Sequence, residues 1–136
     1  MSRSGYYEEI DDQWAHIRYR GAVKSAIRGK RGQAFLREML AALDALPEKK
    51  LITDDLQAEG QVCAIGSVGL ARNIDMSAID AHDAPQVADA FGINEKLARE
   101  IVYENDEAWY ISETPEQRFQ RMRNWVLSQI KKDGEQ

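Results

Sequence analysis

The apolar residues of this chain recur at the spacing of α-helices, and this periodicity restricts the fold more than any other feature of the sequence. The clearest example is the stretch from about 33 to 46, where one helix face is apolar and Pro47 then ends the helix. The residues of this stripe are Phe35, Leu36, Met39, Leu40, Leu43 and Leu46. Residues from about 10 to 28 also fit a helix, on which the spacing of Trp14 places this side chain in the core.

Capping residues locate further helices. Between 83 and 106, Asp83 and Asn94 are suitable N-caps, and Gly92 suits the left-handed residue that ends a helix, so two short helices are predicted here. The sequence Thr-Pro-Glu-Gln at 114–117 has the form of a capping box with proline at the first helical position, and it predicts the start of a last helix.

Residues 61–73 fit either a helix or a buried strand. Apolar and small residues alternate here as in a strand, but Gly66 and Gly69 are unfavourable in a strand interior, and no second strand is apparent. We favour a helix. The sequence therefore predicts a mostly α, compact single-domain bundle of about five to six helices over 1–136, with frayed ends at 1–8 and 133–136.

The sequence also excludes several kinds of site and location. Cys63 is the single cysteine, so an intrachain disulfide is excluded, and with two distant histidines, His16 and His82, no metal site is expected. The N-terminus is polar and acidic, unlike a secretory signal, and no apolar stretch approaches the roughly 18 residues of a membrane span. We expect a cytoplasmic protein that contacts no membrane and binds no cofactor.

No catalytic constellation of side chains is recognisable. The acidic residues of 75–83 fail the calcium-loop pattern, because alanines stand where glycine and glutamate are needed. Asp106 and Glu107 are adjacent acids, but no further ligand set points to them. We therefore expect a protein that is not an enzyme, and an enzyme using these two acids is a minor alternative.

Charge is unevenly distributed along the chain, whose formal net charge is −5. Between 13 and 37 there are seven Lys/Arg and no Asp/Glu, whereas between 53 and 107 there are twelve Asp/Glu and three Lys/Arg. Two interpretations are open. Either the two segments face each other and their charges pair around the fold, or the basic segment forms a patch that binds an anionic partner.

The loop predicted over 28–32 is the best candidate for an anion site. It holds three cations and backbone N–H groups just before a helix N-terminus, which attracts phosphate or carboxylate, although the spacing of a P-loop is absent. The residues that we expect to contact a macromolecule are Arg20, Lys24, Arg28, Lys30 and Arg31.

Residues 86–102 resemble a helix-turn-helix, with Gly92 at the turn. A recognition helix lies among DNA phosphates, but the second helix here carries Glu95, Glu100 and Glu104. We therefore favour a helical hairpin that contributes to the core. Nucleic-acid binding, through this unit or through the basic segment 18–37, is the alternative function.

Four stretches carry a likeness to known proteins, namely 20–23 (RGAV), 25–46 (SAIRGKRGQAFLREMLAALDAL), 62–69 (VCAIGSVG) and 101–107 (IVYENDE). Together they resemble a group of small proteins encoded by bacteriophages and prophages. The resemblance supplies no catalytic residues. It implies a non-enzymatic phage-type accessory protein in a bacterial cytoplasm, which binds a host or defence protein with an acidic surface, as an inhibitor, or binds nucleic acid. The oligomeric state stays open.

Overall fold

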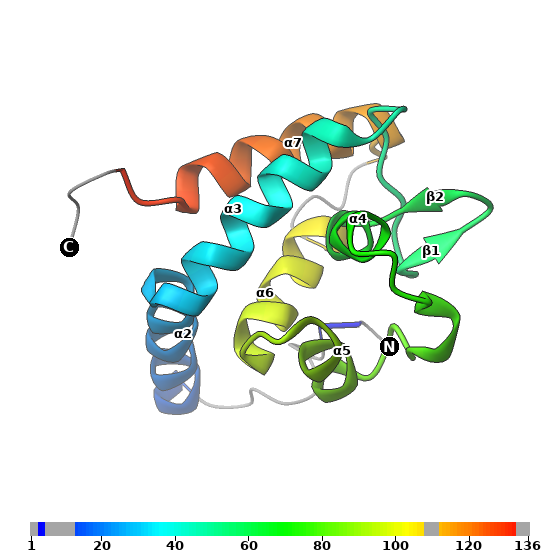
Figure 1. Cartoon of the computed structure of the whole chain (residues 1–136). Coiled ribbons are helices and arrows are strands. Elements are labelled where there is room, and N and C mark those ends of the chain that lie inside the picture. Colours follow the sequence, from blue (N-terminus) through cyan, green and yellow to red (C-terminus); the bar gives the residue numbers. More distant parts are fainter. Residues whose placement is uncertain (1–2, 5–12, 108–111, 133–136) are drawn as a thin grey trace.

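The structure, a computed structural model, describes residues 3–4, 13–107 and 112–132, and in this part of the chain it is a mostly α single domain (Figure 1). This confirms the predicted fold class. The elements in chain order are α2 (Gln13–Arg28), α3 (Lys30–Ala45), β1 (Gln57–Ala58), β2 (Gln61–Val62), α4 (Ala64–Ala71), the 3-10 turn η1 (Met76–Ala78), α5 (Ala84–Phe91), α6 (Glu95–Asp106) and α7 (Pro115–Gln129).

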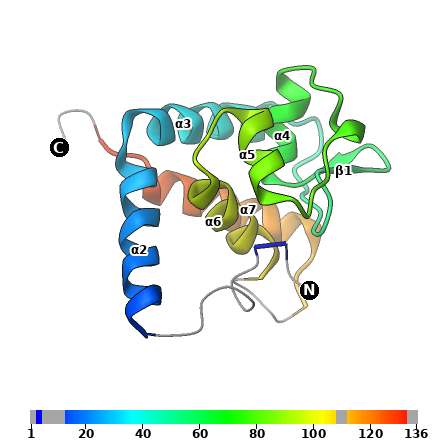
Figure 2. The same cartoon turned by 90° about the horizontal axis from the view of Figure 1, so that it is seen from below.

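Helix α6 is the centre of the fold. It contacts α2, α4, α5 and α7, while α3 packs against α4 and α7 on the other side of the core. Leu97 and Ile101 of α6 and Leu36 and Leu43 of α3 are fully buried in this core. Figure 2 shows α2 along one edge of the molecule, joined to α3 at a sharp corner.

The predicted capping residues act as caps. The side chains of Asp83 and Asn94 each accept a hydrogen bond from a backbone N–H in the first turn of α5 or α6. Gly92 ends α5 with a φ of 70°, in the left-handed region. Thr114 and Gln117 form the complete capping box of α7. Cap chemistry is local, so the sequence could predict it.

The stretch 61–73 is mainly helical, as we favoured, but its start is not. Gln61–Val62 pairs antiparallel with Gln57–Ala58 in a short hairpin, so a second strand exists that the sequence did not reveal. Gly66 lies inside α4 against the preceding chain, where a Cβ would sit 2.0 Å from the carbonyl oxygen of Leu56. This glycine therefore allows close packing of a helix, which is why it does not break one.

Two expectations about the N-terminal part are wrong. Trp14 was predicted to lie in the core, but 71% of it is exposed, because α2 buries a different face, through Val23 and Ile27. Arg3 and Ser4 were predicted to be frayed, but both are buried. The other residues predicted to fray lie outside the described residues.

An ion pair holds Arg3 in place, and hydrogen bonds hold Ser4. The Arg3 guanidinium donates to both carboxylate oxygens of Asp106, at 2.6 and 2.7 Å. The Ser4 hydroxyl donates to a carboxylate oxygen of Glu107, and the Ser4 carbonyl accepts from Arg99. The two adjacent acids that the sequence singled out therefore bind this segment of the same chain.

Candidate binding surface

The corner between α2 and α3 is much tighter than predicted. The sequence indicated a loop over 28–32, but α2 ends at Arg28 and α3 begins at Lys30, so Gly29 alone separates the two helices. The cations of this region therefore project from two helix ends and not from a loop.

Gly32 is the physical reason for the tight corner. It is buried in the first turn of α3, and a Cβ at this position would lie 1.9 Å from the carbonyl oxygen of Ala26. Without a side chain, the backbones of α2 and α3 can approach each other closely. Gly32 therefore lies inside α3, and not in a loop over 28–32, and it is a contact residue between two helices.

Gln33 joins the end of α7 to the same corner. Its side-chain amide donates to the carbonyl oxygen of Ile27, at 2.8 Å, and to that of Gln129, at 3.0 Å. Its side-chain oxygen accepts from the backbone N–H of Lys131, at 2.8 Å. One buried side chain thus connects the end of α2, the start of α3 and the chain after α7.

These contacts bring basic residues from three segments to one end of the molecule. Arg37 of α3 donates to the carbonyl oxygen of Lys131, at 2.6 Å, so the chain after α7 lies along α3. Figures 1 and 2 both show this part of the chain beside the corner. We call this surface the basic corner; its residues are Lys24, Arg28, Lys30, Arg31, Arg37, Lys131 and Lys132.

The basic corner contains four of the five predicted contact residues. Lys24, Lys30 and Arg31 are exposed, and no carboxylate in the described part of the chain forms an ion pair with them. Arg28 is exposed as well. The contribution of Lys131 and Lys132 was missed, because it depends on the long-range bonds of Gln33, for which the sequence holds no signal.

The corner also contains a hollow of about 220 Å³ at the start of α3. Lys30 and Arg31 line it, together with Asn94 and Leu97 from the start of α6. Gly29 occupies the N-cap position of α3 and provides no side-chain cap. Cations beside an uncapped helix N-terminus favour anions, because the helix dipole and the side chains act in the same direction.

Arg20 is the predicted contact residue that we leave out of the basic corner, because it is paired within the chain. Its guanidinium forms a two-bond ion pair with the carboxylate of Glu100, at 2.8 and 3.0 Å. Glu100 is buried in α6, so this pair fastens α2 to the central helix. Arg20 lines a groove of about 470 Å³ between α2, α6 and α7, which also contains Lys24, Glu104 and Trp125.

The surroundings of Glu104 in that groove disfavour the charged form of its carboxyl group. Burial raises the pKa of Glu104, and the negative charge of Glu100 raises it further, while Arg121 and Arg20 act in the opposite direction.

The helix-turn-helix-like unit consists of α5 and α6, joined by a short turn at Gly92. Every residue of α6 is buried or half-buried, because this helix lies at the centre of the fold. A recognition helix needs an exposed face that can enter the major groove. The geometry of α6 thus disfavours DNA binding through 86–102.

Most ion pairs in the described part of the chain use other arginines. Arg72 pairs with Glu38, Arg123 with Asp44, Arg121 with Glu113, and Arg3 with Asp106. The interpretation that the basic and acidic segments neutralise each other therefore applies to Arg20, but not to Lys24, Lys30 or Arg31.

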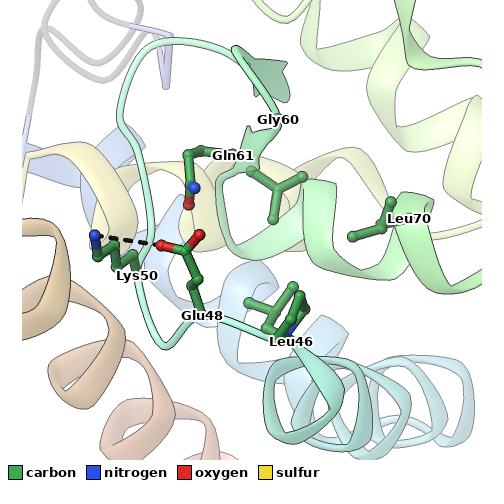
Figure 3. A pocket seen from close by; sticks show the side chains of 8 residues that line it. Leu46, Glu48, Lys50, Gly60, Gln61 and Leu70 are labelled. Atoms are coloured by element: carbon green, nitrogen blue, oxygen red, sulfur yellow. Dashed lines mark ion pairs between the residues drawn. The ribbon is translucent and has the colours of Figure 1, made fainter.

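Other candidate sites are occupied or too small. Asp75 and Asp83 accept hydrogen bonds as helix caps, and no cluster of potential metal ligands exists among the described residues. A pocket of about 60 Å³ lies beside Leu46 and Leu70, and Glu48 and Lys50 form an ion pair there at 3.3 Å (Figure 3). This volume holds a few water molecules and no organic ligand, since ligand sites span about 300–1,000 Å³.

Within the ranges that the structure describes, no helix has the length and apolar character needed to span a membrane. Comparison with protein families, with curated proteins and with solved structures gives no match for this chain.

Proposed function

We propose that this chain is a non-enzymatic binding protein whose basic corner contacts an acidic surface of a partner protein. The observation that carries the proposal is the exposure of Lys30 and Arg31, which have no carboxylate partner in the described part of the chain, beside the uncapped start of α3. Cations in such a place attract anionic groups and steer their approach.

A protein partner is favoured over nucleic acid because apolar side chains adjoin the cations. Leu40, Leu127 and Ile130 line a hollow of about 550 Å³ that Arg37, Lys131 and Lys132 border. Protein interfaces combine an apolar centre with a charged rim, whereas a phosphate backbone is bound by cations and polar groups.

The resemblance to phage-encoded proteins supplies the biological setting of the proposal. In that setting the chain acts in a bacterial cytoplasm, and its partner is a host or defence protein that it inhibits by occupying an acidic surface. Nucleic-acid binding through the basic segment is the second candidate, and the cations of the corner favour it.

The test compares anionic probes on the pure protein. We expect fluorescent polyglutamate to bind at low salt, with affinity reduced at least tenfold by Lys30→Glu combined with Arg31→Glu. Lys50→Glu is the control, because Lys50 is a half-buried lysine beyond the opposite end of α3, where it pairs with Glu48. DNA or RNA that binds more tightly than polyglutamate, with affinity falling by orders of magnitude as salt rises, favours the second candidate. If no anionic probe binds, both proposals fail.

A further inference from the structure

Helix α2 presents an apolar stripe to solvent. Trp14 is 71% exposed and Ile17 is 51% exposed, and both lie one or two turns before Gly21 on the same face of the helix. Exposed aromatic and aliphatic side chains that lie together, and not singly, are typical of interaction sites. The buried face of α2 is a different one, formed by Val23 and Ile27.

Gly21 follows Trp14 and Ile17 on this face and borders the groove between α2, α6 and α7, and packing among the described residues does not explain a glycine there. Among the described residues, and apart from the backbone of α2 itself and the two chain neighbours, no atom lies within 4 Å of the position that a Cβ would occupy there. Glycine in a helix interior costs about 1 kcal/mol relative to alanine. Gly32 and Gly66 offset this cost through close backbone contacts in the same chain, but Gly21 has none. A glycine here suits the close approach of a backbone from another molecule.

The charge on α2 restricts what that molecule can be. The helix contains no carboxylate, and its helical repeat places Arg18 on one flank of the stripe and Lys24 on the other. Both side chains are exposed. A second copy of the chain would bring two such basic helices together, which like-charge repulsion opposes. A segment with carboxylates on both sides of an apolar face fits the same surface without that penalty.

We propose that α2 is a docking surface for an acidic amphipathic helix of a partner protein. Apolar side chains of that helix cover Trp14 and Ile17, its carboxylates meet Arg18 and Lys24, and its backbone crosses over Gly21. The proposal rests on the proposed function for the kind of partner, and it names the part of the partner that is recognised. Helix-in-groove and helix-on-helix recognition of this kind uses apolar anchors three and four residues apart.

The experiment uses three fluorescent 18-residue peptides and the full chain. The first peptide is helical, with a leucine stripe flanked by glutamates; the second has the same stripe flanked by lysines; the third is polyglutamate without a stripe. We expect the first peptide to bind at least tenfold more tightly than either of the others in fluorescence anisotropy.

Three variants locate the binding. Trp14→Ala and Gly21→Leu are each expected to weaken binding of the first peptide at least tenfold, because one loses an anchor and the other blocks the helix approach. Leu70→Ala is the control, since Leu70 is also a partly exposed apolar residue but lies on α4. Circular dichroism checks that each variant keeps its helical content.

The outcomes separate the two proposals. If polyglutamate binds as tightly as the amphipathic acidic peptide, or if the α2 variants bind normally, the docking inference is wrong while the proposed function stands. If no acidic peptide binds, the proposed function fails as well. If sedimentation shows a dimer that Trp14→Ala dissociates, the stripe is a contact between copies, and the inference is also overturned.

Discussion

The side-chain amide of Gln33 donates to the carbonyl oxygen of Gln129, at 3.0 Å, and thereby holds the end of α7 against the corner between α2 and α3. The same side chain bonds to Ile27 and Lys131, so all three of its hydrogen bonds cross between segments. The position of the lysines that follow α7 depends on this single buried side chain.

Gln33→Ala is therefore expected to lower the free energy of unfolding by about 2 kcal/mol, since each net hydrogen bond contributes about 1 kcal/mol and the freed backbone groups stay partly buried. Urea denaturation followed by circular dichroism measures the change. Gln120→Ala is the control, because Gln120 lies on the exposed side of α7 and bonds only to Asn124 among the described residues. Equal stability of the two variants would show that Gln33 does not hold the corner.

The elements that the sequence predicted well are those whose signals are local. Thr114, Gln117 and Gly92 act within a few residues of their own positions, so cap chemistry located α5, α6 and α7. The apolar stripe of α3 was equally clear, because its buried face repeats with the period of the helix.

The features that the sequence could not predict depend on contacts between distant segments. Arg20 resembles its basic neighbours in sequence, and only the packing of α6 beside α2 shows that Glu100 neutralises it. Trp14 has the spacing of a core residue, but the tertiary fold buries another face of α2. Periodicity predicts which residues share a helix face, and it does not predict which face is buried.

The pH dependence of stability is expected to include a contribution from Glu104. Burial and the charge of Glu100 raise the pKa of Glu104 in the folded state above its ordinary value of 4.5. Between the unfolded and the folded pKa, the folded state therefore binds more protons, and stability falls as the pH rises through this range. Because glutamine does not ionise, Glu104→Gln removes this loss of stability at higher pH.

Relative to wild type, Glu104→Gln should thus become more stable as the pH increases from about 4 to about 8. Urea denaturation at several pH values measures the difference between the two proteins. Glu116→Gln, which changes an exposed glutamate at the start of α7, serves as the control. A constant difference between Glu104→Gln and wild type over this range would contradict the assignment.

Two glycines of the basic segment 18–37 should change the stability of the protein in opposite directions when each is replaced by alanine. Gly32→Ala places a methyl carbon 1.9 Å from the carbonyl oxygen of Ala26, so the α2–α3 corner must open. We expect this substitution to lower the free energy of unfolding by about 3 kcal/mol. Gly21→Ala meets no atom within 4 Å from other segments of the described chain and should stabilise the free protein by up to about 1 kcal/mol, because alanine restricts the unfolded chain and favours the helix. Thermal denaturation of both variants beside wild type tests the pair. Destabilisation by Gly21→Ala would mean that the exposed face of α2 is packed within the chain, and it would remove the physical basis for a docking surface there.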